Sequence, residues 1–245
     1  MIDTHAHLDA LDDPEAAIRR ALEAGVTRIL SVGTTIDGGR RTLELARRHD
    51  GVYAVLGIHP HEAAAEGGRV DELAELLADP RAVAVGETGL DFYRDRAPRD
   101  RQRMLLEAEL ALAEELDKPA VIHTRAADAE TADVLAGFGG TVVLHCFSSA
   151  ALLPVALERG YYVSFAGNVS FPNASELRLA ASQVPADRVL VETDSPYLAP
   201  QPVRGRPNEP ANVVHTLAAV AAARDEDPSE LEAQVDANAN AAFGL

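Results

Sequence analysis

Residues 82–123 have the sequence AVAVGETGLDFYRDRAPRDRQRMLLEAELALAEELDKPAVIH, which predicts a strand, a long helix and a second strand. The runs Ala82–Gly86 and Ala120–His123 are short and apolar, as expected for strands of a buried sheet. The helix is predicted over Arg99–Leu116, where apolar residues recur at helical spacing: Met104, Leu105, Ala108, Leu112 and Leu116. A strand, a crossover helix and a parallel strand form the repeating unit of α/β folds.

The same alternation continues on both sides of this segment. Asp13-Pro14-Glu15 predicts the start of a helix, with a cap, a first-turn proline and an early acid, and Gly25 predicts its end. Six further strands are predicted at Ile2–Leu8, Thr27–Val32, Val52–Ile58, Thr141–His145, Tyr161–Phe165 and Arg188–Glu192. Eight βα units in 245 residues match a (β/α)8 TIM barrel, which typically has about 250 residues. A doubly wound open sheet shares the alternation and stays open as an alternative. No linker is visible, so residues 1–245 are predicted to form one domain.

Composition limits the class of protein and the cellular compartment that can be expected. The hydrophobic content of 47% and the charged content of 25% are typical of soluble globular proteins. No uncharged apolar stretch approaches the ~18–20 residues needed to span a bilayer, and no signal peptide is visible at Met1–His5. Cys146 is the single cysteine, which excludes an intrachain disulfide. We therefore expect a cytoplasmic protein with no membrane association, and no obligatory protein partner is evident.

The net charge of −17 gives no general attraction for nucleic acid. Bound divalent cations would nevertheless reverse the field locally, so the charge does not exclude a phosphate-containing substrate.

His5 and His7 lie two residues apart near the end of the first predicted strand. Residues i and i+2 of a strand face the same side, so both imidazoles are expected to point into the barrel. Two converging neutral imidazoles favour a divalent-metal site. A pair of surface histidines on an edge strand is the alternative.

Four more residues that can bind a metal lie at the carboxyl ends of predicted strands. In a parallel barrel these ends meet at one face, where active sites form. The full candidate set is His5, His7, Glu87, His123, His145 and Asp194. Six ligands exceed the needs of one four-coordinate ion and favour two divalent cations, with Glu87 as the bridge and a catalytic residue. For Asp194 the role stays open between metal ligand and catalytic base. A carbamylated lysine cannot replace Glu87, because the only lysine, Lys118, precedes Pro119 at the start of a predicted strand.

Seven segments, in order and spanning nearly the whole chain, resemble the TatD family of metal-dependent deoxyribonucleases, which have amidohydrolase-like barrels. They are IDTHAHLD (2–9), GIHPH (57–61), GETGLDFY (86–93), PAVIHTR (119–125), HCFS (145–148), ETDSPYL (192–198) and RGRPNEP (204–210). The resemblance implies the same six metal ligands and exonucleolytic hydrolysis of DNA phosphodiester bonds by a metal-activated water. The ions would be Mg, Mn, Zn or Ni, because imidazole ligands suit transition metals and phosphodiester chemistry often uses Mg.

Substrate contacts are predicted in the loops beside these ligands. His59 could donate to a phosphate, or belong to a loop organised by Pro60. Arg125 could clamp a phosphate or pair with an acid. Arg204 and Asn208 follow the eighth strand, where barrels often bind phosphates, or they hold the loop in place. A strip of arginines could contact a nucleic-acid backbone or form a solvated helix face: Arg94, Arg96, Arg99, Arg101 and Arg103. A hydrolase of the same barrel acting on an amide, ester or lactone is the alternative function, since neutral substrates suit an acidic protein.

Overall fold

The computed structural model describes residues 1–245 and contains eight strands, whose order in the sheet follows the chain. The pairings described below are parallel. The strands are β1 Ile2–Ala6, β2 Arg28–Gly33, β3 Val52–Leu56, β4 Ala82–Asp91, β5 Ala120–Arg125, β6 Val142–Leu144, β7 Tyr162–Phe165 and β8 Val189–Val191. A parallel bridge between Ala6 and Ser195 joins β1 to the segment just beyond β8. This link between the first and last strands confirms the (β/α)8 barrel and excludes the open sheet.

Ten α-helices alternate with the strands along the chain. Asp13 caps the first by accepting a hydrogen bond from the Ala16 N–H, as the sequence predicted. None of the helices is long and apolar enough to cross a bilayer. They are α1 Pro14–Glu23, α2 Ile36–Arg48, α3 Ala63–Glu66, α4 Val70–Leu77, α5 Arg99–Glu115, α6 Asp128–Leu135, α7 Leu153–Arg159, α8 Ser175–Gln183, α9 Val213–Arg224 and α10 Pro228–Phe243.

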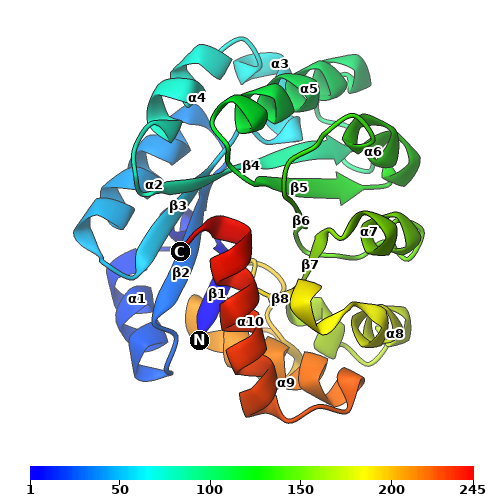
Figure 1. Cartoon of the computed structure of the whole chain (residues 1–245). Coiled ribbons are helices and arrows are strands. Elements are labelled where there is room, and N and C mark those ends of the chain that lie inside the picture. Colours follow the sequence, from blue (N-terminus) through cyan, green and yellow to red (C-terminus); the bar gives the residue numbers. More distant parts are fainter. The chain divides into compact units, whose positions relative to one another are not determined.

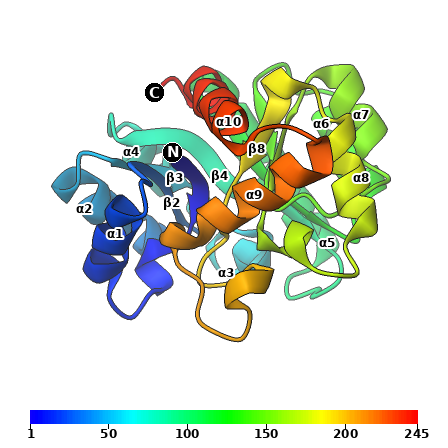
Figure 2. The same cartoon turned by 90° about the horizontal axis from the view of Figure 1, so that it is seen from below.

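The contacts divide the chain into two compact units. The first unit comprises Met1–Ser31 and His145–Leu245, and the second comprises Val32–Leu144. In the first unit α9 and α10, the orange and red helices of Figures 1 and 2, pack against each other and against β8. In the second unit β4 and β5 lie side by side with α5 packed along β4 (Figure 1). The prediction of one domain over residues 1–245 stays a prediction.

Strand β4 continues five residues beyond the predicted end at Gly86, so Glu87 lies within the strand and not after it. Residues Thr88–Asp91 pair with Ile122–Arg125 of β5, after a shift in register that follows Val85. The two strands approach so closely that a Cβ on Gly86 would lie 2.6 Å from the Val121 carbonyl oxygen. Gly86 also has a φ of +147°, which a residue with a side chain rarely adopts. The glycine therefore permits the extension that carries Glu87.

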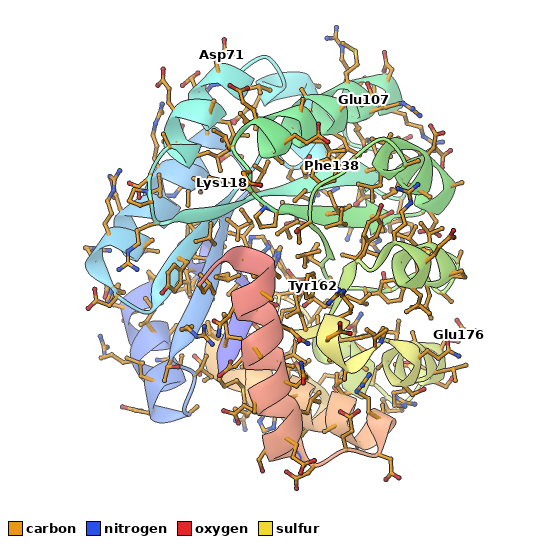
Figure 3. The ribbon with its side chains drawn as sticks, in the orientation of Figure 1. Asp71, Glu107, Lys118, Phe138, Tyr162 and Glu176 are labelled. Atoms are coloured by element: carbon orange, nitrogen blue, oxygen red, sulfur yellow. The ribbon has the colours of Figure 1, made fainter.

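The buried face of α5 differs from the predicted apolar stripe. Met104 is exposed, whereas Gln102 and Glu109 are buried beside Leu105, Leu112 and their apolar neighbours. Glu107, on the opposite side of the helix, points outward in Figure 3. The apolar spacing predicted the helix, but it did not reveal that two polar side chains are buried on it.

Lys118 lies at the amino ends of β4 and β5 (Figure 3). Its Nζ donates a hydrogen bond of 2.5 Å to the carbonyl of Ala82, the first residue of β4. Partial burial lowers the pKa of this amine. Glu87 lies in the second half of β4, toward its carboxyl end, so the only lysine is at the opposite end of the strands from that carboxylate.

Candidate metal centre

The first unit holds a cluster of four side chains, called here the first cluster: His5, His7, His145 and Asp194. His5 lies in β1 and His7 directly follows it, and both are buried. Their ring centroids are 5.1 Å apart, and the His5 ring stacks on His145 at 4.0 Å. The Nε2 of His7 lies 3.4 Å from Oδ1 of Asp194. Ligand atoms of His5, His7 and Asp194 all lie within 4.8 Å of one another, as a metal site requires.

Backbone pairing between the first and last strand segments positions this cluster. The Asp194 N–H donates to the His5 carbonyl at 2.9 Å, and the His7 N–H donates to the Ser195 carbonyl at 2.8 Å. Asp194 has a φ of 54°, in the left-handed region that non-glycine residues seldom occupy. Such a strained conformation is maintained where the surrounding contacts hold the backbone in place, and it is often found at functional sites.

The charge state of Asp194 suits a metal ligand. Burial acts to raise the pKa of its carboxyl group, but the hydrogen bond and charge of His7, with the nearby His145 and His5, outweigh burial and lower it. The carboxylate is therefore ionised near neutral pH.

The Nδ1 of His145 faces Oε1 of Glu192 at 3.2 Å, and the same oxygen accepts the Cys146 N–H at 2.8 Å. A carboxylate in this position fixes the ring orientation of a ligating histidine. Glu192 is thus a supporting residue of a candidate ligand in the first cluster.

The second unit holds its own cluster, called here the second cluster: His59, His61, Glu87, Asp91 and His123. Oε1 of Glu87 lies 2.8 Å from Nδ1 of His123 and 3.4 Å from Nε2 of His59. The ligand atoms of these three residues also meet the distance condition for one ion. Glu87 comes from β4 and His123 from the neighbouring β5, so strand pairing brings them together.

Asp91 orients the histidines of the second cluster. Its Oδ2 lies 2.9 Å from Nε2 of His61 and 3.4 Å from Nε2 of His123, while Oδ1 accepts the N–H groups of Tyr93 and Arg94. Burial opposes ionisation, but the hydrogen bonds from His123, the Arg94 amide and His61 lower the pKa of Asp91 below its usual value. A His123 ring that donates Nε2–H to Asp91 can offer Nδ1 to a metal.

The hydrogen bonding of the His59 ring favours the neutral tautomer with its proton on Nε2. Burial lowers the pKa of its imidazole to about 4, so the ring is neutral near pH 7. Its Nδ1 accepts the His61 N–H at 3.1 Å, which places the ring proton on Nε2. A protonated Nε2 cannot bind a metal. In this tautomer the candidate ligands of the second cluster are Glu87 and His123, and His59 is a hydrogen-bond donor.

Two buried acids support the clusters and were missed by the sequence analysis. Glu109 accepts the Ile58 N–H at 2.7 Å and the Thr88 hydroxyl at 2.5 Å, directly beside His59 and Glu87. In the first unit, the buried acid is Asp3, which accepts the N–H groups of His5 and Thr193. Burial raises the pKa of each to about 8 against the effect of its hydrogen bonds. A signal for Glu109 existed, because it lies four residues after Leu105 on the apolar face of α5.

The remaining predicted substrate contacts lie at the end of β5 and in the segment after β8. Arg125 is exposed, with its Cζ 4.1 Å from the ring centroid of Tyr93. Arg204 is also exposed, 3.8 Å over Phe171. Asn208 is buried, and its amide donates to the carbonyls of Thr193 and Tyr197, which matches the alternative role of holding the loop in place.

A model of the family described as TatD related DNase matches residues 2–244. The chain belongs to this family. A relative named as an uncharacterized metal-dependent hydrolase TatD, from Mycobacterium tuberculosis, is 40% identical and covers 100% of this chain and 98% of its own length. A relative from Klebsiella pneumoniae, named as a 3′-5′ ssDNA/RNA exonuclease TatD, is 36% identical. The match covers 95% of this chain and 92% of the relative's length. The crystal structure of a TatD homologue from Escherichia coli K12 superposes with a TM-score of 0.93 at 30% identity, over 100% of this chain and 98% of that one.

Membership in the TatD family confirms the predicted class of protein, a metal-dependent hydrolase on a (β/α)8 barrel. Metal dependence is thereby confirmed, whereas the number and the identity of the ions stay predictions. The roles of the individual site residues, including the six predicted ligands, stay predictions.

Proposed function

We propose that this protein is a divalent-metal-dependent nuclease that hydrolyses DNA phosphodiester bonds from a strand end. The family and the relative named as a 3′-5′ ssDNA/RNA exonuclease support exonucleolytic action on single strands. By analogy with that relative, the direction is 3′ to 5′ and RNA is a second substrate.

The observation that supports a polyanionic substrate is a set of arginines without carboxylate partners near the ends of the strands that carry candidate ligands. Many arginines of this acidic chain pair with carboxylates, as Arg47 does with Asp79 and Arg103 with Asp133. Five exposed arginines without a carboxylate partner lie at or after the carboxyl ends of site strands, namely Arg94, Arg96 and Arg125 in the second unit and Arg204 and Arg206 in the first. Unpaired cations at the ends of strands that carry candidate ligands would attract phosphates despite the net charge of −17.

The donor atoms present fit divalent cations. The first cluster offers the imidazoles of His5 and His7 and the ionised carboxylate of Asp194, a set that suits Zn, Mn or Ni. Mg remains compatible through the carboxylates of Asp194 and Glu87. When bound, the cations lower the pKa of a water molecule and polarise the phosphoryl group. We propose that two ions bind, with Glu87 as the bridging carboxylate, because a carboxylate can give one oxygen to each ion and Lys118 lies at the opposite end of β4.

The chain's own residues would bind and orient the phosphodiester. The Nε2–H of His59, which faces Oε1 of Glu87 at 3.4 Å, could turn to donate to a phosphoryl oxygen when substrate binds. Arg125 and Arg204 would balance the charge of neighbouring phosphates. Asp194, ionised in the folded protein, either binds a cation or accepts the proton of the attacking water.

The test is incubation of metal-reconstituted protein with single- and double-stranded DNA of defined ends, and RNA, beside phosphomonoesters, amides and lactones. We expect mononucleotides to accumulate from one end of single strands with Mg, Mn or Zn. Turnover of a lactone, amide or other ester with no cleavage of nucleic acid under any of these metals would replace the nuclease by the alternative hydrolase. Neutral substrates leave the five unpaired arginines without a role.

A further inference from the structure

Two tyrosines are the only aromatic side chains among the large hydrophobic residues that the fold leaves exposed. Tyr93 is 64% exposed and Tyr197 is 57% exposed. Each follows a strand segment that carries a candidate ligand, since Tyr93 comes two residues after the end of β4 and Tyr197 three residues after Asp194. Single exposed hydrophobic residues are common on any protein surface. The side chains around Tyr93 and Tyr197 and the rigidity of their backbone therefore decide whether these two tyrosines are binding residues.

The backbone of Tyr93 is held firmly although its ring is exposed. Its N–H donates to Oδ1 of Asp91 at 3.0 Å, and the Arg94 N–H donates to the same oxygen at 2.8 Å. The preceding Phe92 N–H donates to the Arg125 carbonyl at 2.9 Å, which joins the turn to the end of β5. The ring therefore stands on a turn that is organised by a residue of the second cluster.

Cations flank the ring of Tyr93. The Cζ atoms of Arg125 and Arg94 lie 4.1 and 5.8 Å from its centroid, and neither guanidinium is paired with a carboxylate. An exposed aromatic face with unpaired arginines beside it is the combination that binds single-stranded nucleic acid, because bases stack on the ring and phosphates meet the cations.

Tyr197 lies beside the first cluster. Its N–H donates to the Asp194 carbonyl at 2.8 Å, and its own carbonyl accepts the Asn208 amide at 2.6 Å. Its ring centroid lies 5.8 Å from that of His7, so the exposed ring directly borders a candidate ligand. A substrate bound to the first cluster would meet this ring.

We propose that Tyr93 and Tyr197 are stacking platforms for nucleobases, and that they restrict the nuclease to single strands or frayed ends. Bases inside a duplex are stacked on both faces and offer no free surface to a tyrosine, whereas the bases of a single strand do. The inference rests on the proposed nuclease function and assigns the residues that select its substrate.

The experiment compares Tyr93→Leu and Tyr197→Leu with Tyr→Phe at each position. Met104→Ala and Leu179→Ala are matched controls, because these side chains are 60% and 61% exposed on α5 and α8. The substrates are a single-stranded oligonucleotide, the same strand with abasic sites, and methyl p-nitrophenyl phosphate, a diester without a base. The leucine variants should raise KM for the normal strand by about 5- to 150-fold, with little change in kcat. The phenylalanine variants and both controls should behave as wild type.

The abasic strand and the small diester separate stacking from structural damage. Their KM should not respond to either leucine substitution, because they offer no base at these positions. Unchanged KM for the normal strand in both leucine variants, or an equal rise for the abasic strand, would overturn the stacking role while leaving the nuclease intact. A wild-type protein that cleaves no nucleic acid would overturn the proposed function and this inference together.

Discussion

The hydroxyl of Thr193 donates a 2.6 Å hydrogen bond to the buried carboxyl group of Asp3, and this pair ties β1 to the segment beyond β8. Asp3 also accepts the Thr193 N–H at 2.9 Å and the His5 N–H at 3.3 Å. His5 lies two residues after Asp3 and Asp194 one residue after Thr193. One buried side chain thus aligns two candidate ligands that are 189 positions apart in the sequence.

Asp3→Ala should lower the free energy of unfolding by about 2–4 kcal/mol, because the Thr193 N–H and hydroxyl lose their acceptor inside the protein. Urea unfolding measures the change. Thr193→Ser keeps the hydroxyl and should cost much less than Asp3→Ala. Equal stability of Asp3→Ala and wild type would mean that the pair does not hold the two strands together.

Glu87→Ala should remove at least one ion per chain, measured by elemental analysis after reconstitution and desalting. The reason is that a bridging carboxylate contributes an oxygen to each ion. Glu109→Gln is the matched control, since Glu109 is a buried acid of the same unit that is not a candidate ligand, and it should retain the full metal content. Full occupancy in Glu87→Ala would refute the bridging role.

Asp91→Asn should weaken metal binding by about 10- to 100-fold, because Asp91 orients His123 without being a proposed ligand. Competition with a chelator of known affinity gives the change. Asp95→Asn, an exposed substitution four residues further along, should leave the affinity unchanged. If both variants bind metal like wild type, the orientation of His123 does not depend on Asp91.

Glu109 should make stability depend on pH. Burial raises its pKa in the folded protein from 4.5 to about 8, so the folded state retains a proton that the unfolded chain releases between these values. Its contribution to stability is complete below pH 4.5 and is lost as the pH rises to about 8. Relative to Glu109→Gln, wild type should therefore lose a few kcal/mol, about 2–4, across this interval. A stability difference that is constant from pH 4.5 to 8 would contradict the raised pKa.

The strands were predictable from the sequence because each is a short apolar run that ends in a turn or a polar residue. All eight predicted runs contain a strand, and only β4 departs substantially, ending at Asp91 and not at Gly86. Its extension depends on the close approach of β5 at Gly86 and Gly89, which is a tertiary contact. Local patterns could not show that a strand continues through two glycines.

The candidate ligands were also predictable, because histidines and acids at strand ends converge in a parallel barrel. Their supporting residues were not. Asp91 and Glu109 act through hydrogen bonds to residues 30 or more positions away, to His61 and His123 for Asp91 and to Ile58 for Glu109. Such partners are set by packing, and no spacing in the sequence encodes them.

The most direct test of the proposed function is the rate of nucleotide release from a 3′-labelled single strand, measured as Mn²⁺ is titrated into metal-free protein. We expect no release before the cation binds, a rate that rises with bound metal, and no recovery in Glu87→Ala at the same total Mn²⁺. Nucleotide release at full rate from the chelated, metal-free protein, or from Glu87→Ala, would contradict a metal-dependent nuclease in which Glu87 is essential.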